Sequence, residues 1–130
     1  MRPEERDLPD KTFPKTNHLL KSSEFKSVFG KGRKLVTGVL VFHYLRTDLS
    51  EPRLGLAVSR KVGNAVKRNH VKRRIREAFR EKKAHFHISH DIVVYPRRGV
   101  LDKHFDEYVK SFDVLLSRIG RPKKVQPRKV

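Results

Sequence analysis

The sequence predicts one α+β domain, an α/β sandwich in which helices pack against a single β-sheet. Two observations support this fold class. Apolar residues recur at helical spacing in three segments, and β-branched or aromatic runs occupy the stretches between them. The elements follow in the order helix, strands, helix, strand, helix, which is typical of a sheet covered by helices. At 130 residues, the chain has the length of one small domain with a hydrophobic core.

The first predicted helix lies in KSSEFKSVFGKG, after an irregular arm (residues 1–17) that contains three prolines. One of the two serines at its start is the expected N-cap, and its two glycines are expected to end it. Phe25, Val28 and Phe29 recur at the spacing of one helix face. The arm is excluded from the folded domain, which we expect to span residues 18–119.

Two strand-like runs follow this helix. KLVTGVLVFHYLR is β-branched and aromatic, and Gly38 marks a bulge or a break within it. RLGLAVS alternates large and small side chains. We expect the large residues to face the core, and the small ones to leave a surface that another molecule can approach closely. The large set is Leu54, Leu56 and Val58; the small set is Gly55, Ala57 and Ser59.

KVGNAVKRNHVKRRIREAFR predicts a strongly basic helix, from about residue 65 to residue 83. At about 100° per residue, an apolar stripe forms one side and polar residues lie almost opposite it. The stripe is Val71, Ile75, Ala78 and Phe79, and the outward set is Asn69, Arg73, Arg76 and Arg80. Gly63 and Asn64 precede the helix and predict either a phosphate site at its N-terminus or a turn with an N-cap.

The remaining elements are a strand, a helix and a tail. HFHISHD is expected to be a loop, and IVVYPR (92–97) reads as a nearly continuous apolar strand. Residues 102–119 form an amphipathic closing helix. Its apolar stripe consists of Phe105, Tyr108, Val109, Phe112, Leu115 and Leu116. Residues 120–130 are a basic tail without a core of their own.

The charge distribution indicates a polyanionic partner. Lys and Arg number 32 against 14 Asp and Glu, a net charge of +18. Eleven bases and two acids lie between Arg60 and Lys83, a net +9. A solvated helix surface usually mixes the two signs, because opposite charges at i and i+4 stabilise a helix. The excess therefore favours binding to the phosphate backbone of a nucleic acid.

Composition also excludes several classes of protein. The chain has no cysteine, which rules out disulfides, thiol catalysis and metal sites with cysteine ligands. No apolar run approaches the roughly 18 residues of a membrane span. The first residues also lack the apolar core of a secretory signal. We therefore expect a cytoplasmic protein that does not bind a membrane.

The basic helix carries a resemblance to a known family. KxGxAxxRNxxKRxxR, starting at Lys61, resembles the Arg-Asn-Arg signature of the protein subunit of bacterial ribonuclease P. RLGLAVSRK before it and EFKSVFGKG upstream are similar to the same family. An apolar strand and a closing helix downstream also fit. The resemblance spans about residues 17 to 119, and neither end of the chain takes part in it.

The resemblance implies a fold, a function and partners. The fold would have the element order αβββαβα, with a four-stranded sheet and a left-handed βαβ crossover, like ribosomal-protein S5 domain 2. The protein would be an accessory subunit of a ribonucleoprotein endonuclease that removes the 5′ leader of precursor tRNA. The RNA subunit would catalyse hydrolysis with Mg²⁺, and the protein alone would bind no cofactor or metal and supply no catalytic residue. Its partners would be the catalytic RNA and precursor tRNA, not DNA.

The resemblance also implies two sets of site residues. Contacts to the catalytic RNA and nearby phosphates are expected from Arg60, Lys61, Lys67, Arg68, Asn69, Lys72, Arg73, Arg76 and Arg80. The leader cleft is expected to be lined by Phe25, Phe29, Val41, His43, Ala57 and Ser59. From helical spacing alone, the two phenylalanines fit a core role equally well. His43 stands where the family favours a larger aromatic residue, which would soften stacking there.

Three rival interpretations remain open at the level of sequence. A metal-dependent nuclease would use the cluster His85, His87, His90 and Asp91, but no glutamate base lies at a recognised spacing. A structural RNA-binding protein of ribosomal type is the main alternative, because composition cannot separate it from a ribonuclease P subunit. A DNA-binding helix is disfavoured, because no helix-turn-helix partner precedes the basic helix.

Overall fold

The computed structural model describes residue 18 and residues 21–86 and 89–119. The predicted N-terminal arm, the basic tail and His87 lie outside these residues. The α-helices are α2 (Ser22–Lys31), α3 (Ala65–Lys82) and α4 (Phe105–Ile119), and the strands are β1 (Arg33–Val36), β2 (Leu40–Arg46), β3 (Arg53–Leu56) and β4 (His90–Pro96). Short 3₁₀ turns lie at Arg60–Val62, Lys83–His85 and Val100–Asp102. None of the described helices is long and apolar enough to cross a bilayer.

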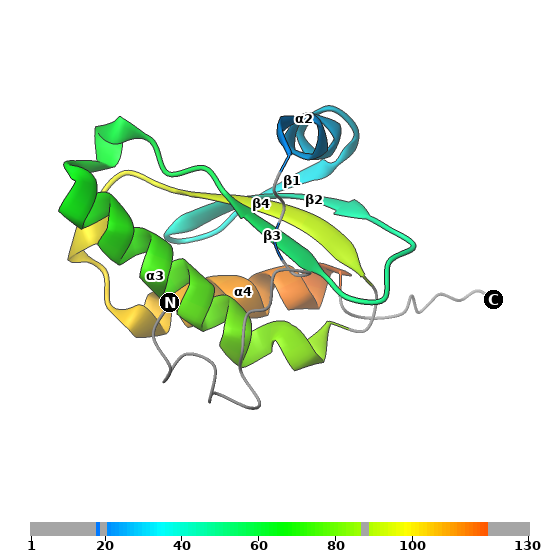
Figure 1. Cartoon of the computed structure of the whole chain (residues 1–130). Helices are drawn as coiled ribbons and strands as arrows, with labels where there is room; N and C mark the ends of the chain where they lie inside the picture. The colour runs from blue at the N-terminus through cyan, green and yellow to red at the C-terminus, as the bar shows by residue number, and fades with distance from the viewer. Residues whose placement is uncertain (1–17, 19–20, 87–88, 120–130) are drawn as a thin grey trace, which may run out of the picture.

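The four strands form one mixed sheet in the order β1-β2-β4-β3. β2 is antiparallel to both β1 and β4, whereas β3 runs parallel to β4. A parallel pair needs a long crossover, and α3 supplies it. Figure 1 shows α3 and α4 on one side of the sheet and α2 on the other. The predicted α+β class and the order αβββαβα are confirmed.

Gly38 marks a break rather than a bulge. The first strand-like run folds into β1 and β2, joined by a turn in which the Thr37 N–H donates to the Leu40 carbonyl at 2.9 Å. The Thr37 hydroxyl lies 2.8 Å from the Leu40 carbonyl and 2.7 Å from the Ser111 hydroxyl. The turn is therefore attached to α4 as well as to the sheet.

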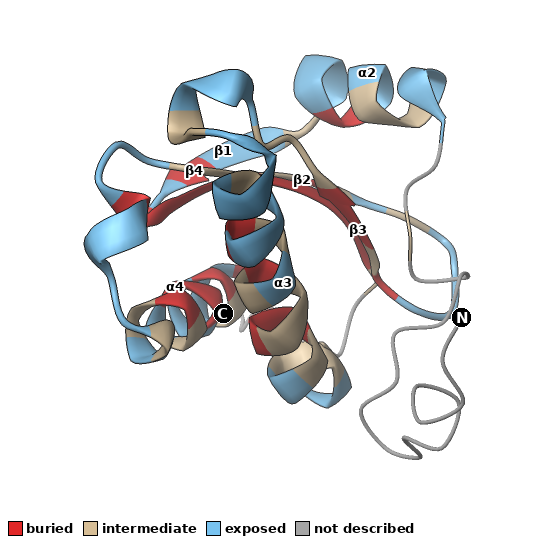
Figure 2. Ribbon diagram, turned by 60° about the vertical axis from the view of Figure 1, so that its left-hand side comes forward, coloured by how far each residue is buried: buried red, intermediate tan, exposed pale blue. Residues whose placement is uncertain are grey.

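The main core lies between the sheet and helices α3 and α4. Phe112 of α4 meets Phe42 of β2 with ring centroids 5.0 Å apart, and Phe79 of α3 at 6.1 Å. Figure 2 shows the buried stripes of both helices turned toward the sheet. The predicted stripe of α3 is confirmed, since Val71, Ile75, Ala78 and Phe79 are all fully buried.

On the opposite face, α2 makes a smaller contact with the sheet. Val28 is fully buried against Val93 of β4. The helix ends in the tight approach of Gly32, where a Cβ atom would lie 2.5 Å from the carbonyl oxygens of Val28 and Tyr44. Only glycine fits there, so the absence of a side chain at Gly32 allows the end of α2 to lie close to β2.

The predicted caps of α2 need correction. The N-cap is Lys21 rather than a serine, because the Lys21 N–H donates to the carboxylate of Glu24 at 2.9 Å. Gly30 lies inside the helix, which continues until the Gly32 N–H donates to the Val28 carbonyl at 2.8 Å. The carboxylate of Glu24 thus satisfies the N–H of the N-cap residue, which is the glutamate half of a capping box, and no N-cap hydroxyl takes part.

Two further boundaries differ from the prediction. β4 begins at His90 rather than Ile92, because His90 and Asp91 pair with the end of β2 and leave the expected loop. The closing helix starts at Phe105, three residues late. Gly99 adopts a left-handed conformation (φ 83°) that starts a 3₁₀ turn at Val100–Asp102 before the helix.

Candidate nucleic-acid interface

The start of α3 is held by its own backbone and caps. The Asn64 side chain accepts a hydrogen bond from the Lys67 N–H at 3.0 Å, which is the N-cap alternative of the sequence analysis. Gly63 has φ 150°, and a Cβ atom there would lie 2.8 Å from the Lys67 side chain. The Arg68 guanidinium donates to the Gly63 carbonyl at 3.1 Å. The Arg68 side chain therefore stabilises the turn that precedes the helix, and it still contributes a positive charge to the surface.

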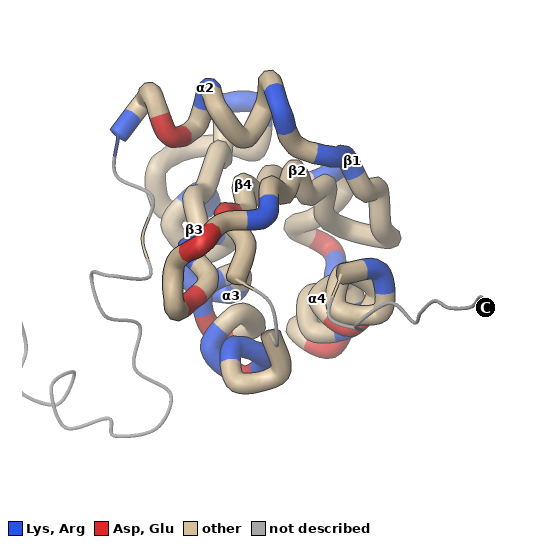
Figure 3. Tube along the Cα trace, turned by 90° about the vertical axis from the view of Figure 1, so that its right-hand side faces the viewer, with Lys and Arg blue, Asp and Glu red and all other residues tan. Residues whose placement is uncertain are grey.

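The buried stripe of α3 turns its basic residues away from the core. Figure 3 shows Lys and Arg positions distributed along α3. Of the nine predicted RNA-binding residues, the exposed ones are Arg60, Lys61, Lys67, Asn69 and Arg73. The partly buried ones are Arg68, Lys72, Arg76 and Arg80. No salt bridge within the described residues engages the eight cations of this set, so their charge is available to an anionic partner.

Arg76 does not point straight outward as the helical projection predicted. Together with Lys72 it lines a small cavity of about 170 Å³ beside β3, bounded also by His18 and Phe25. Burial, followed by the nearby charge of Arg80, lowers the pKa of Arg76. An anion placed there would relieve both effects, because it would pair with a charge that is partly removed from water.

The side of the sheet opposite α3 carries three aromatic side chains, of which Phe29 is exposed and His43 and Tyr95 are half-buried. Phe29 of α2 is 44% exposed, and its ring meets that of His43 edge to face at a centroid distance of 4.7 Å. His43 stacks on Tyr95 at 5.6 Å and 28°, and its Nε2 atom lies 3.2 Å from the Tyr95 hydroxyl. Burial, followed by the charge of Lys34, lowers the pKa of His43. The three rings form a surface on which planar groups can stack.

The other predicted cleft residues take different positions. Val41 is buried, while Phe25 and Ala57 pack around Val28 and Val93 under α2. Ser59 caps the 3₁₀ turn that follows β3, with its hydroxyl accepting from the Lys61 N–H at 3.3 Å. Phe25 therefore has the packing role that its spacing also allowed. Phe29 and His43 remain the open aromatic residues of the predicted set.

Sequence reasoning missed Tyr95, although a signal was present. Tyr95 lies two residues after Val93 in β4, so the two side chains share one face of the sheet. Its register partner is Val41, a residue already placed in the cleft. Strand alternation therefore adds Tyr95 to the predicted cleft only after the antiparallel pairing of β2 and β4 is known, and that pairing comes from the tertiary structure.

A groove of about 720 Å³ connects the aromatic face with the segment before α3. Tyr95, Ala57 and Ser59 line it on one side, and Lys61 lines it beside the basic helix. Arg97 and Arg98, which sequence reasoning also missed, add two cations. Arg97 donates to the Thr37 carbonyl at 2.8 Å, which fixes its direction. The groove thus brings Tyr95 of the aromatic face, Lys61 of the segment before α3 and two arginines to one depression.

Of the predicted metal-binding cluster, the structure describes His85, His90 and Asp91, and His87 lies outside the described residues. Within the part of the chain that the structure describes, no three His, Asp or Glu side chains come together as metal ligands. Asp91 instead holds Arg53 through both carboxylate oxygens, at 2.8 and 2.7 Å. The side chain of His90 is buried in β4 beside the ring of Tyr44.

The comparisons with known proteins decide the family. The family model for ribonuclease P matches residues 13–120. This chain belongs to the ribonuclease P protein family. The ribonuclease P protein component of Petrotoga mobilis is 40% identical over 98 residues, which are 75% of this chain and 82% of the relative. That of Syntrophus aciditrophicus is 34% identical over 107 residues, which are 82% and 90%.

Solved structures of the ribonuclease P family agree with the fold. The RNase P protein from Thermotoga maritima is 32% identical and matches with a TM-score of 0.71, over 78% of this chain and 96% of that one. The protein from Staphylococcus aureus is 31% identical, with a TM-score of 0.70 over 78% and 94%. The resemblance inferred from the basic helix is therefore confirmed.

Proposed function

We propose that this chain, as the protein subunit of ribonuclease P, binds the catalytic RNA along α3 and the 5′ leader of precursor tRNA on the face beside α2. In this way it promotes 5′ maturation of tRNA. The observation that carries the proposal is the groove that is lined both by Tyr95, one of the three stacked rings, and by Lys61, just before α3. A strand that leaves the catalytic RNA can follow this groove onto the aromatic rings.

The α3 surface supports binding to folded RNA. Arg73 and Asn69 are exposed on the side away from the core. An Arg guanidinium donates in a fork that matches phosphate oxygens, and an Asn amide can bond sugar or base edges. A phosphate brought near these cations also reduces their mutual repulsion, so binding offsets the cost of concentrating charge on one helix.

The open sheet face supports binding to a single strand. Bases of an unpaired strand stack on aromatic side chains, while cations follow the phosphates. Phe29, His43 and Tyr95 supply the rings, and Arg97 and Arg98 lie in the groove that continues from them. Such a surface accepts many leader sequences, because every base has a stacking face.

Hydrolysis itself is assigned to the RNA subunit. In this proposal, Mg²⁺ acts on the RNA, and the protein contributes affinity and position rather than a catalytic group. The cytoplasm, as the place where precursor tRNA is processed in bacteria, is the proposed site of action. Every protein residue proposed at the site binds or orients RNA, which distinguishes this function from that of a metal-dependent nuclease.

Reconstitution tests this function. The purified chain is combined with a bacterial ribonuclease P RNA and precursor tRNA at low millimolar Mg²⁺, and 5′ cleavage is followed over time. We expect strong stimulation over RNA alone, and no cleavage by the protein with Mg²⁺ alone. Cleavage without RNA would overturn the accessory role. Tight RNA binding without any stimulation would instead favour a structural RNA-binding protein.

Replacing Arg73 with Ala tests the role of α3. The loss of one phosphate contact is expected to weaken RNA binding and to lower the slope of log K against log salt by roughly one. Filter binding or fluorescence titration at several salt concentrations measures that slope. Arg118→Ala on α4 is the matched control, since Arg118 is also an exposed helical arginine. Equal slopes for the two variants would rule out α3 as the contact surface.

A further inference from the structure

The α2 helix is attached to the sheet by two different kinds of contact. Its apolar contact is small, with Val28 alone fully buried on this helix. Its polar contact is Arg53, which reaches from β3 to the first turn of α2. Because the apolar contact is small, we expect the polar contact to have a strong influence on the position of α2 relative to the sheet.

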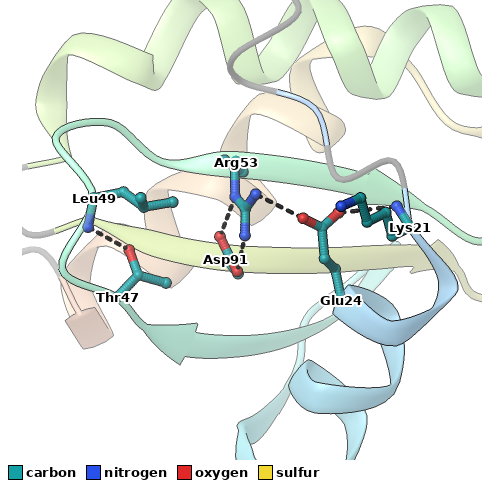
Figure 4. A network of polar contacts seen from close by, with 6 residues as sticks. All are labelled: Lys21, Glu24, Thr47, Leu49, Arg53 and Asp91. Atoms are coloured by element: carbon teal, nitrogen blue, oxygen red, sulfur yellow. Dashed lines mark hydrogen bonds and ion pairs between the residues drawn. The ribbon is translucent and has the colours of Figure 1, made fainter.

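Arg53 joins three elements through one side chain, as Figure 4 shows. Its Nε and Nη2 atoms donate to the two oxygens of Asp91 in β4 at 2.8 and 2.7 Å. Its Nη1 atom donates to Glu24 of α2 at 2.9 Å. The remaining Glu24 oxygen accepts from the Lys21 N–H at 2.9 Å. Glu24 therefore caps α2 and ties it to the sheet at the same time.

Strand register and burial restrict the positions of the three side chains in this network. Arg53 and Asp91 are register partners in the parallel pair of β3 and β4, so the backbone places them side by side. The side chains of Arg53, Asp91 and Glu24 are only 22%, 9% and 23% exposed. The hydrogen bond to Asp91, followed by the charges of both carboxylates, raises the pKa of Arg53 against the opposing effect of burial. A bidentate guanidinium also resists rotation better than a single contact does.

We propose that Arg53 is a positioning residue for the leader surface, which is formed by the rings of Phe29, His43 and Tyr95. Through Glu24, Arg53 holds α2 in the position in which the exposed ring of Phe29 contacts the ring of His43. Arg53 does not contact the leader. Arg53 instead affects the position of Phe29 through α2, because Glu24 lies in the first turn of this helix and Phe29 lies further along the same helix. This inference rests on the proposed function, since it assigns Arg53 a role in leader recognition.

Glu24→Gln is the most selective variant. It removes the charge that binds Arg53 from the side of α2, yet leaves both Arg53–Asp91 hydrogen bonds and the sheet intact. The matched control is Asp113→Asn, which breaks the salt bridge of Lys82 with Asp113 (2.8 Å) between α3 and α4, on the other side of the sheet. Each variant neutralises the carboxylate of one ion pair and leaves an amide oxygen that can still accept a hydrogen bond, although Asp113 is more exposed than Glu24 (52% against 23%). A general effect of losing one ion pair is therefore present in both variants, and only Glu24→Gln alters the attachment of α2.

The first measurement is the affinity of the reconstituted holoenzyme for precursor tRNA with a leader and for the same tRNA without one. In the Glu24→Gln variant, the preference for the leader is expected to fall about threefold to tenfold, the size of one ordinary hydrogen bond, because glutamine loses the charge but can still accept a hydrogen bond. Affinity for leaderless tRNA is expected to stay unchanged. Asp113→Asn is expected to keep the full preference.

The second measurement is made on the protein alone and does not depend on RNA binding or cleavage. The chain contains no cysteine, so a pair introduced at exposed Lys26 of α2 and exposed Lys34 of β1 can carry two spin labels. We expect the distance distribution between the labels to broaden when Glu24→Gln is added, and to stay as narrow as the parent when Asp113→Asn is added. An unchanged distribution in Glu24→Gln would overturn the positioning role.

The outcomes separate the inference from the function on which it rests. If the wild-type holoenzyme shows no preference for the leader, the proposed function fails. If the wild type shows the preference and Glu24→Gln keeps it, the positioning role fails alone. An equal loss of affinity for both tRNAs, with a lower melting temperature, would make Arg53 a purely structural residue and would also overturn the inference.

Discussion

The two faces of the sheet differ in how much side chain they bury. The face covered by α3 and α4 belongs to a cluster of 17 buried residues, whereas the cluster under α2 has two, Val28 and Val93, among the described residues. Both faces carry aromatic rings. Phe42 and Phe112 are fully buried on the first face, while Phe29 is 44% exposed on the second. The chain therefore uses similar residues for packing on one side and, in the proposed function, for contact with RNA on the other.

This difference indicates that one face of the sheet provides most of the stability of the fold, while the other face is available for recognition of a partner. Burial of apolar area provides most of the folding free energy, so the α3 and α4 face supplies most of it. The α2 face can then leave rings in solvent without loss of the fold. Exposed apolar groups that gather beside cations mark a binding surface. Three predictions test this separation, beginning with the largest expected effect.

Replacing Phe79 with Ala is expected to destabilise the protein by about 3–5 kcal/mol, because a fully buried ring leaves a cavity that the neighbouring rings do not fill. Urea denaturation followed by circular dichroism measures the free energy of unfolding. A loss below about 1 kcal/mol would show that the two faces contribute alike, and would break the comparison.

Replacing Phe29 with Ala is expected to leave folding nearly unchanged, because the ring is half exposed and alanine favours the helix. Leader-dependent affinity of the holoenzyme is expected to fall by about 1–3 kcal/mol, the range for losing one stacked base. Titration with leader-bearing and leaderless tRNA measures the difference. If both affinities fall together, Phe29 does not belong to the leader surface.

The smallest expected effect concerns His43 and pH. Its pKa is lowered from 6.5, chiefly by burial and further by Lys34, so the unfolded chain binds a proton more readily than the folded chain does. The stability from the neutral ring is complete above pH 6.5, falls as the pH drops below that value, and levels off below the folded pKa. His43→Phe is expected to flatten this part of the profile slightly.

The free energy of unfolding between pH 5 and pH 7.5, from urea titrations, tests this effect. His104→Gln removes another histidine, one exposed outside the leader surface, and serves as the control. If His43→Phe and His104→Gln change the profile equally, the burial of His43 has no effect on stability.

Several features were predictable because they depend on local periodicity. The stripe of α3, the alternation of RLGLAVS and an irregularity at Gly38, expected as a bulge or a break, all follow from residues within a few positions of one another. The signature beginning at Lys61 was long enough to indicate the family. The serine cap of α2 was wrong, because the helix begins earlier than expected: Ser22 is its first residue, and Lys21 is the N-cap whose N–H donates to Glu24.

By itself, the sequence determined the helices, the buried stripes, the basic surface of α3 and the family to which the chain belongs. The tertiary structure alone decided the strand order β1-β2-β4-β3, which places Tyr95 beside His43 and Arg53 beside Asp91. Arg53 is 38 residues from Asp91 and 29 from Glu24. Helical and strand periods describe neighbours along the chain, whereas such contacts arise only when the sheet brings distant segments together.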